Sequence, residues 1–483
     1  MASLMRRTVA GLGKTASLTV VKSALDAGIF IALVWIFGGP EALGKFGFVF
    51  VLIELFHRLS NFGGHRHLIQ RRDLSRDDVS TVAVTEGAAA LLWTVVWIVA
   101  SPALFRWLDP TLLPGAQLVG IWLLTERIGQ PARALLEREM CFGRSNGAML
   151  CGTVALGLVA VPLALAGWGV EAWLAGKVAQ SAATSLLFWV FAGARPRFTW
   201  SRAAAKPFLR FGLPLTAAEL LQFFNSQCPI LVLRFVLDDW SVIGLYYAAY
   251  RLPEYLSQLQ ALVSTVVYPA FTRTRDDAQL LEGFRLVTKY SAAVVALPFA
   301  IVLALGLGVT AHLLPAGYRD ATLPLQILTG LVAFRMTTVN WHHVHIAKRI
   351  TWVITWIAGV NAIGVVVGIL LGVRIGMAEG GDRGAIVGVA IGVAVASIAA
   401  LLLAVNVYLK RLLPVRFLPL IALPCVVGAV TCALGLGLRA AGLDQTSATQ
   451  FWTAVAAMTI LYVLLGLALD RRALRDLWKR ARA

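Results

Sequence analysis

The sequence predicts an all-α integral membrane protein with 14 transmembrane helices, organised as two pseudo-symmetric six-helix lobes and a C-terminal helix pair. Of its 483 residues, 59% are hydrophobic and only 14% are charged. Soluble domains carry about 25% charged residues. A bilayer-spanning helix needs about 20 mostly apolar residues, and stretches of that size recur along the whole chain.

The apolar stretches define the expected helices in order. The predicted segments are 18–37, 46–62, 82–105, 117–136, 149–166, 170–191, 211–237, 243–271, 290–314, 321–344, 350–373, 385–409, 417–438 and 451–469. The fourth is the weakest, because Glu126, Arg127, Pro131 and Arg133 interrupt it. We expect it to be broken or partly outside the membrane.

Basic residues predict the orientation of these helices. With a cytoplasmic N-terminus, 31 of the 43 Lys and Arg residues fall on the cytoplasmic side, 6 on the opposite side and 6 within spans. Cytoplasmic loops of membrane proteins are enriched in Lys and Arg. An odd span count would destroy this alternation, so both termini are predicted to be cytoplasmic. The net charge of +18 then reflects topology and attraction to an anionic leaflet, and no nucleic acid partner is expected.

The gaps between segments limit the possible functions. The longest, 63–81 and 192–210, are short and lie on the predicted cytoplasmic side. A membrane polysaccharide polymerase or ligase would normally carry a sizeable extracytoplasmic loop for its acceptor. The sequence therefore predicts no enzyme activity, no catalytic residue and no cofactor. His342, His343 and His345 lie beside Lys348, which favours an interfacial anchor over a metal site.

A weak internal duplication appears at an offset of about 200 residues, as in many transporters built from repeats. The segment 42–46 (ALGKF) aligns with 242–246 (VIGLY), and Glu54 aligns with Glu254. One residue of slippage then aligns 76–78 (RDD) with 275–277 (RDD). The duplication predicts an N-terminal six-helix lobe (1–195), a C-terminal six-helix lobe (196–412), and two additional transmembrane helices with a basic cytoplasmic tail (413–483).

Polar residues recur at helical spacing in the first two segments of each lobe. Ionisable groups are costly in lipid and usually face a bundle interior or an aqueous cavity. The four polar stripes are Thr15, Thr19, Lys22 and Asp26; Glu54, His57, Arg58 and Asn61; Glu219, Gln222 and Ser226; and Tyr247, Arg251, Glu254 and Gln258.

These stripes predict one shared cavity. Three internal charge pairs are expected at i,i+3 or i,i+4 spacing: Lys22 with Asp26, Glu54 with Arg58, and Arg251 with Glu254. An alternative remains that the pairs only neutralise one another and hold helices together.

The chain resembles the polysaccharide transporter, or Wzx-like oligosaccharide flippase, family of the multidrug/oligosaccharidyl-lipid/polysaccharide exporter superfamily. The resemblance covers nearly the whole chain. It is carried by 43–47 (LGKFG), 59–63 (LSNFG), 68–75 (LIQRRDLS), 134–142 (ALLEREMCF), 209–214 (LRFGLP), 244–250 (GLYYAAY), 267–271 (VYPAF) and 317–328 (GYRDATLPLQIL).

The resemblance implies a flippase of a bacterial inner membrane. Its substrate would be an undecaprenyl-pyrophosphate-linked oligosaccharide, moved from the cytoplasmic to the periplasmic leaflet for lipopolysaccharide or exopolysaccharide biosynthesis. Membrane lipids, a polysaccharide polymerase and a chain-length regulator are the other candidate partners. A pyrophosphate or acidic sugar in a low-dielectric slab needs compensating cations, and we expect these to be Lys22, Arg58 and Arg251. Asp26, Glu54 and Glu254 are the candidates for proton or sodium coupling.

Three alternatives remain open. A cation-coupled multidrug exporter would share the architecture, but its cavity should be net acidic or aromatic. A peptidoglycan-precursor flippase of the same superfamily would differ only in its lipid-linked substrate. A membrane polysaccharide polymerase or ligase is disfavoured by the missing extracytoplasmic loop.

Overall fold

The computed structural model describes residues 2–71, 73–193, 199–273, 277–348, 350, 352–412 and 416–469. Side chains are described for these residues except 2–16, 258–273, 277, 343, 346, 347 and 411. The described chain is helical and contains no strand. It forms two compact units, Met1–Tyr247 and Ala248–Ala483, and each is considered by itself.

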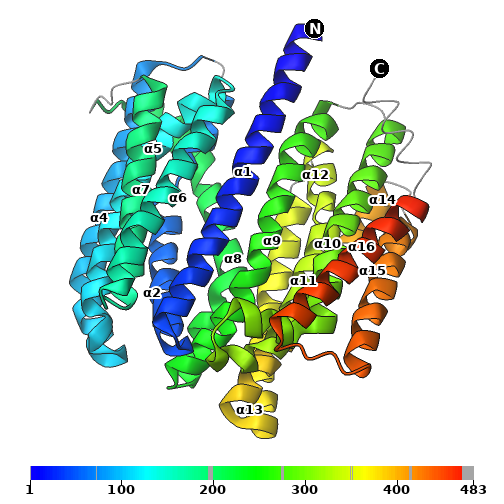
Figure 1. Ribbon diagram of the computed structural model, residues 1–483. Helices are drawn as coiled ribbons and strands as arrows, with labels where there is room; N and C mark the ends of the chain where they lie inside the picture. The colour runs from blue at the N-terminus through cyan, green and yellow to red at the C-terminus, as the bar shows by residue number, and fades with distance from the viewer. Residues whose placement is uncertain are drawn as a thin grey trace. The chain divides into compact units, whose positions relative to one another are not determined.

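The first unit contains eight α-helices and the start of a ninth (Figure 1). They are α1 (Ala2–Phe37), α2 (Pro40–Leu59), α3 (Gly64–Gln70), α4 (Arg76–Leu108), α5 (Leu113–Arg138), α6 (Phe142–Leu165), α7 (Val170–Ala192), α8 (Arg202–Val236) and α9 (Trp240–Arg273), with a short 3₁₀ turn, η1 (Pro110–Leu112).

The second unit contains the rest of α9 and the helices that follow it. They are α10 (Asp277–Leu313), η2 (Ala316–Ala321), α11 (Thr322–Thr338), α12 (Asn340–Ala347), α13 (Trp352–Leu403), the π-helical η3 (Ala404–Leu409), α14 (Lys410–Leu412), α15 (Phe417–Ala440) and α16 (Ala448–Leu469). Helix α13 is two helices joined at a kink, because Gly380 and Gly381 leave helical geometry and Gly381 has a φ of 59°. Glycine adopts such positive φ values without steric cost.

The all-α membrane fold is confirmed, and each of the 14 predicted segments overlaps a described helix, with two of them in α13. Nine described stretches are long and apolar enough to cross a membrane. Helices α2, α5, α8 and α9 are not among them, and three of the four polar stripes lie on α2, α8 and α9. Helix α5 is continuous through Pro131, so the fourth segment is not broken.

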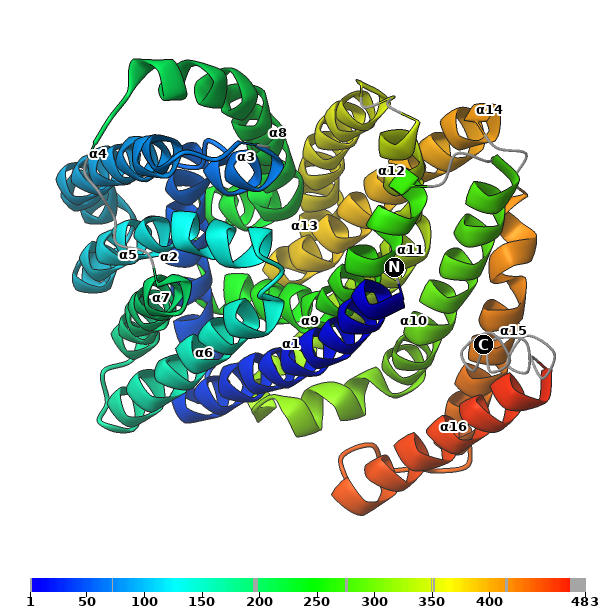
Figure 2. The same ribbon diagram turned by 90° about the horizontal axis from the view of Figure 1, so that it is seen from above.

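In the first unit, α5 packs against both α4 and α7, and α6 packs against α1 and α7 (Figure 2). Helix α4 begins at a capping box, in which the Ser75 hydroxyl accepts from the Asp78 N–H and the Asp78 carboxylate accepts from the Ser75 N–H. Buried aromatic side chains fix the packing. The rings of Phe46 and Trp173 stack at 3.8 Å, and the Trp97 Nε1 donates to the Ala116 carbonyl oxygen at 2.6 Å.

Helix α2 and the start of α9 meet at equivalent positions of the proposed duplication. A Cβ atom built on Gly244 would lie 2.9 Å from the Gly44 nitrogen, and one built on Gly47 would lie 2.5 Å from the Tyr247 ring. Residues 44 and 244, and 47 and 247, are each 200 apart. The duplication itself stays a prediction.

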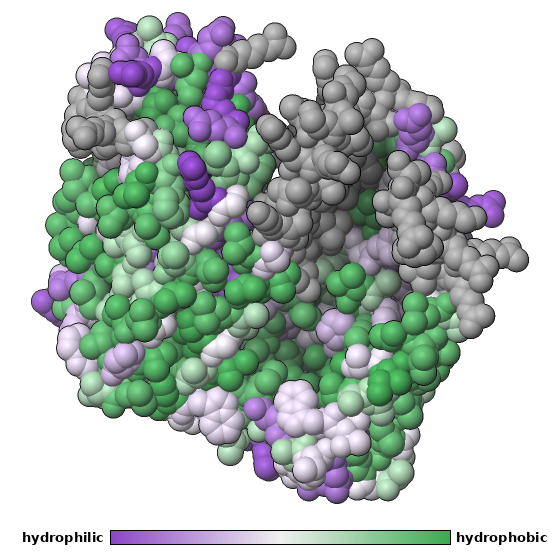
Figure 3. All heavy atoms as spheres, turned by 45° about the horizontal axis from the view of Figure 1, so that its top comes forward, coloured by the Kyte–Doolittle hydropathy of each residue, from purple (hydrophilic) through white to green (hydrophobic). Residues whose placement is uncertain are grey.

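The first compact unit extends beyond the predicted N-terminal lobe, because it also includes α8 and the start of α9. The lobe boundaries at 195 and 412 follow from the repeat and stay a prediction. Hydrophobic side chains cover much of the surface seen in Figure 3, as expected for a chain in lipid. The side chains of Thr15, Gln258, Asp277 and His343, residues 275 and 276 of the repeat match, and the basic tail after residue 469 lie outside the part described.

Candidate functional site

The first unit contains a cavity of about 240 Å³ that Lys22 lines. The other lining side chains come from α2, α5, α6 and α7. Glu54 and Arg58 are not among the lining residues. The prediction that the stripes of both units line one shared cavity stays a prediction.

A chain of polar contacts crosses one wall of this cavity. The Lys22 Nζ lies 2.6 Å from the Asp26 Oδ2, and the Thr153 hydroxyl donates to the other oxygen of Asp26 at 3.1 Å. The Gln180 Nε2 donates to Thr153 at 3.3 Å, and the Lys177 Nζ donates to the Gln180 Oε1 at 3.0 Å. The chain therefore connects α1, α6 and α7 and has an ammonium group at each end.

A second polar network lies where α5 faces α2 and α4. The Arg127 side chain is only 3% exposed and donates to the Ser60 hydroxyl at 3.1 Å and to the His57 carbonyl oxygen at 2.8 Å. The His57 ring lies 3.1 Å from the Glu126 carboxylate. Glu86 is buried on α4 and accepts from the Gly64 N–H at 2.8 Å. Glu126 and Arg127, two of the residues expected to disrupt the fourth segment, thus have polar partners inside the unit.

The stripe of α2 meets the stripe of α8. The Arg58 Nη2 lies 2.7 Å from the Glu54 Oε1, and the Gln227 Nε2 donates to the other oxygen of Glu54 at 3.2 Å. The Asn61 amide donates to Glu219 at 2.6 Å. The structure therefore brings together the two stripes of this unit that lie on α2 and α8.

In the second unit, the Arg251 Nη1 lies 2.6 Å from the Glu254 Oε2, and the guanidinium lies over the Tyr255 ring at 5.4 Å. All three charge pairs expected from the spacing are therefore confirmed. The substrate-binding role of Lys22, Arg58 and Arg251 and the ion-coupling role of Asp26, Glu54 and Glu254 stay predictions.

Several cavity residues were not predicted as part of a stripe. Lys177 belongs to none of the four predicted stripes, but it shares a face of α7 with Gln180, Ser181 and Thr184 in the cavity wall. Their spacing of three or four residues is visible in the sequence. Uncharged polar side chains in an apolar helix indicate a functional site less clearly than charged ones. Nothing in the sequence distinguishes Thr153 and Gln227 from other polar residues of their helices.

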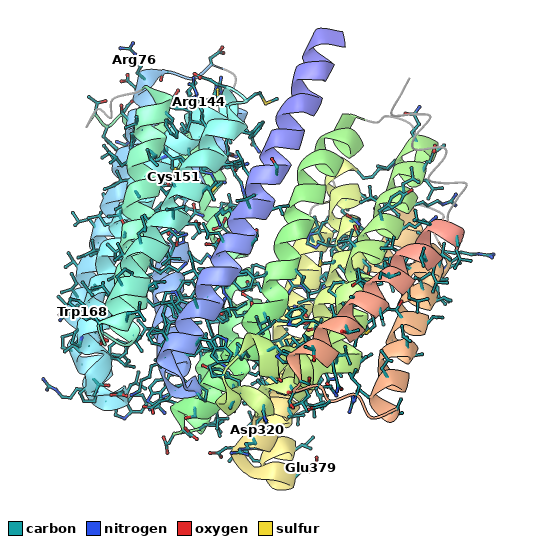
Figure 4. The ribbon with its side chains drawn as sticks, viewed as in Figure 1. Arg76, Arg144, Cys151, Trp168, Asp320 and Glu379 are labelled. Atoms are coloured by element: carbon teal, nitrogen blue, oxygen red, sulfur yellow. The ribbon has the colours of Figure 1, made fainter. Side chains whose placement is uncertain are left out.

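Arg76 and Arg144 lie at one end of the first unit, opposite Trp168 (Figure 4). There the Glu137 carboxylate lies 2.8 Å from the Arg133 Nε and 3.0 Å from the His65 ring. Burial raises the pKa of Glu137, but His65 and Arg133 outweigh burial and lower the pKa to about 2. The predicted charge asymmetry and the assignment of the cytoplasmic face stay predictions.

Comparisons with known proteins connect this arrangement to a family. The family model described as "Polysaccharide biosynthesis protein" matches residues 37–312. The Lipopolysaccharide biosynthesis protein WzxC of Escherichia coli (strain K12) is 27% identical over 284 residues, which are 58% of this chain and 57% of WzxC. The match thus spans little more than half the length of that relative.

Two solved structures share the fold. One is the Lipid II flippase MurJ in an inward closed conformation, with a TM-score of 0.59, 11% identity, and coverage of 97% of this chain and 99% of MurJ. The other is a multidrug resistance MATE family transporter of the MOP superfamily, with a TM-score of 0.58, 18% identity, and coverage of 83% of this chain and 98% of the transporter. At these identities the likeness concerns the fold alone. Because the family model matches more than half of the residues, the chain belongs to the polysaccharide biosynthesis protein family, on the fold of MOP-superfamily flippases and transporters.

Proposed function

We propose that this protein is a flippase that moves a lipid-linked oligosaccharide from the cytoplasmic to the periplasmic leaflet of a bacterial inner membrane. The linking lipid would be undecaprenyl pyrophosphate, and translocation would proceed by alternating access with both termini cytoplasmic. The observation that supports this most is a polar cavity with lysines in its wall, inside a unit in which α1, α4, α6 and α7 are long and apolar enough to cross a membrane. Charged groups inside membrane helices usually mark a substrate or ion path.

The activity can be tested by deleting the gene in its own host. Surface or secreted polysaccharide should disappear while lipid-linked repeat units accumulate on the cytoplasmic leaflet. Leaflet-specific labelling of the lipid-linked glycan measures this directly. If repeat units failed to assemble at all, a transferase role would replace the flippase proposal.

The orientation can be tested by reporter fusions. Fusions after Arg71, after Arg202 and at the C-terminus should report a cytoplasmic location. Those after Asp239 and Asp444 should report a periplasmic one. A periplasmic C-terminus would contradict the even number of spans.

The role of the stripe cations can be tested by a charge-pair cycle. Arg58→Ala should impair export under any model, because it leaves Glu54 as an unpaired, partly buried charge. If Arg58 serves only Glu54, then Arg58→Gln combined with Glu54→Gln should restore export. If Arg58 binds the anionic substrate, the double variant should stay inactive at normal membrane levels.

A matched control is available on the same helix. Glu41 and Lys45 form an i,i+4 pair at 2.8 Å near the start of α2. Changing both to Gln should leave export intact, since Asp109, the other partner of Lys45, keeps its hydrogen bonds from Thr111. The same cycle applies to Lys22 with Asp26 and to Arg251 with Glu254. Full rescue in all three pairs would leave these residues with a structural role only.

A further inference from the structure

The cavity of the first unit contains two kinds of side chain that the charge-pair argument does not use. Phe50, Trp122 and Phe188 supply aromatic rings, and the rings of Phe50 and Trp122 stack at 5.5 Å. Gln130 and Thr184 add an amide and a hydroxyl to the wall. The cavity therefore combines apolar ring surface with neutral donors and acceptors.

The charges around the cavity are balanced. Lys22, Lys177, Arg133 and Glu126 line it, and the partners of Lys22 and Arg133 are Asp26 and Glu137. Three cations thus face three carboxylates, with His57 beside Glu126. A phosphate or a drug cation brought into such a site would lack a compensating charge, which is costly in a low-dielectric interior. This balance of positive and negative charge therefore favours an uncharged ligand that makes strong hydrogen bonds.

The size of the cavity restricts the ligand further. Its volume of about 240 Å³ lies below the range of about 300–1,000 Å³ for sites that take drug-sized molecules. One sugar ring is a small ligand with hydroxyl groups around its edge and apolar C–H groups on its faces. Amides, hydroxyls and ammonium groups can satisfy the hydroxyls, while aromatic rings provide apolar surface for the C–H groups.

We infer that this cavity is a subsite for one sugar ring of the transported glycan, an inference that rests on the proposed function. The Gln130 amide both donates and accepts hydrogen bonds, and Lys22 donates from the opposite helix, α1. Phe50 and Trp122 form the apolar part of the wall. In this arrangement Lys22 binds the glycan, and in the first unit the diphosphate is left to Arg58.

Filling the cavity tests the inference. Met149 on α6 lines the cavity, so Met149→Trp should occupy the space meant for the ring. Leu158 lies on the same helix and is 71% exposed, which makes Leu158→Trp a matched control. The probes are the lipid-linked repeat unit extracted from the host and undecaprenyl pyrophosphate without sugar, each titrated against purified full-length protein in lipid nanodiscs.

We expect Met149→Trp to weaken binding of the sugar-bearing lipid at least tenfold and to leave binding of undecaprenyl pyrophosphate unchanged. Leu158→Trp should change neither. Equal weakening of both lipids would assign the cavity to the diphosphate and overturn the inference. Unchanged binding of both would place the cavity outside the substrate path and overturn it as well.

A second variant tests the same inference independently, in case Met149→Trp does not fold. Gln130→Met keeps the side-chain size and removes the amide, and should weaken only the sugar-bearing lipid, by about three- to tenfold for one or two lost hydrogen bonds. Gln117→Met, at an exposed position of the same helix, is its control. Equal affinities of Gln130→Met and wild type for the sugar-bearing lipid would count against the subsite. Wild-type protein that bound neither lipid would contradict the proposed function itself, and the subsite with it.

Discussion

Helices α5 and α13 associate with their neighbours by different means. Side-chain hydrogen bonds join α5 to three helices. Arg127 donates to a carbonyl oxygen of α2, Trp97 of α4 donates to the Ala116 carbonyl oxygen of α5, and the Thr125 hydroxyl bonds to Ser181 of α7. The two halves of α13 meet backbone to backbone. A Cβ built on Gly368 would lie 2.5 Å from the Gly392 carbonyl oxygen.

The two helices differ in the free energy that it takes to pack them against their neighbours in lipid. Small residues let helices approach closely without any polar group, so α13 needs only its glycines. Buried charges on α5 cost free energy unless every partner is in place. Polar groups of this kind are retained where they serve a function, and α5 is the helix that contributes Trp122, Glu126, Gln130 and Arg133 to the cavity.

Removing the buried guanidinium of α5 should have the largest effect. Arg127→Ala would remove the buried cation whose charge interacts with those of Glu86 and Glu126, and we expect a loss of about 3–5 kcal/mol in the free energy of unfolding. Unfolding in mixed micelles measures this. Arg144→Ala, at an exposed position, should change it by less than about 0.5 kcal/mol. Similar values for the two variants would contradict the view of α5 as held by buried charge.

The end of α5 should make stability depend on pH. The pKa of Glu137 is lowered to about 2 by His65 and Arg133 against the effect of burial. Its stabilisation is therefore complete above the unfolded pKa near 4.5 and is lost as the pH falls through the folded value. One pKa unit corresponds to about 1.4 kcal/mol, so the full effect is on the order of 3 kcal/mol.

Unfolding measured between about pH 6 and pH 2 tests this prediction, because the interval contains both pKa values of the carboxyl group. Glu137→Gln should be less stable than wild type at pH 6 and should lose less stability on acidification. Glu139→Gln, two residues further and exposed, should follow the wild-type curve. A Glu137→Gln curve parallel to wild type would show that the carboxylate contributes nothing.

The sequence predicted α13 more completely than α5. The apolar segments at 350–373 and 385–409 predicted two helices separated by a gap, and the structure has its kink in that gap, at Gly380 and Gly381. For α5, the charges at 126, 127 and 133 suggested a broken helix, because a sequence gives the cost of a charge but not the partner that satisfies it. The partners of Arg127 lie at Ser60 and His57, about 70 positions earlier.

The candidate site shows the same limit. Charge pairs within one helix, such as Lys22 with Asp26, follow from i,i+4 spacing and were predicted. Contacts between helices, such as Asp26 with Thr153 and Glu54 with Gln227, depend on which faces pack together. Hydropathy patterns leave the rotation of each helix about its axis open when most of its residues are apolar.

Enlarging a glycine in α13 should have a moderate effect. In Gly372→Leu the new side chain would meet the carbonyl oxygen of Gly388, so the helices must separate, at a cost of about 1–3 kcal/mol. Gly359→Leu is the matched control on the same helix, because nothing lies within 4 Å of a Cβ there. Thermal unfolding of both variants measures the difference. Equal melting temperatures would mean that close approach does not stabilise the hairpin.

The smallest effect should come from a neutral hydrogen bond of α5. The Thr125 and Ser181 hydroxyls lie 2.5 Å apart between α5 and α7, and interhelical hydrogen bonds in membranes contribute about 0.6 kcal/mol on average. A cycle of Thr125→Val, Ser181→Ala and the double variant isolates this coupling. We expect about 0.5–1 kcal/mol in the free energy of unfolding, well below the loss in Arg127→Ala. A coupling of several kcal/mol would mean that α5 is held by its neutral hydrogen bonds, and that its buried charges are free to serve the substrate.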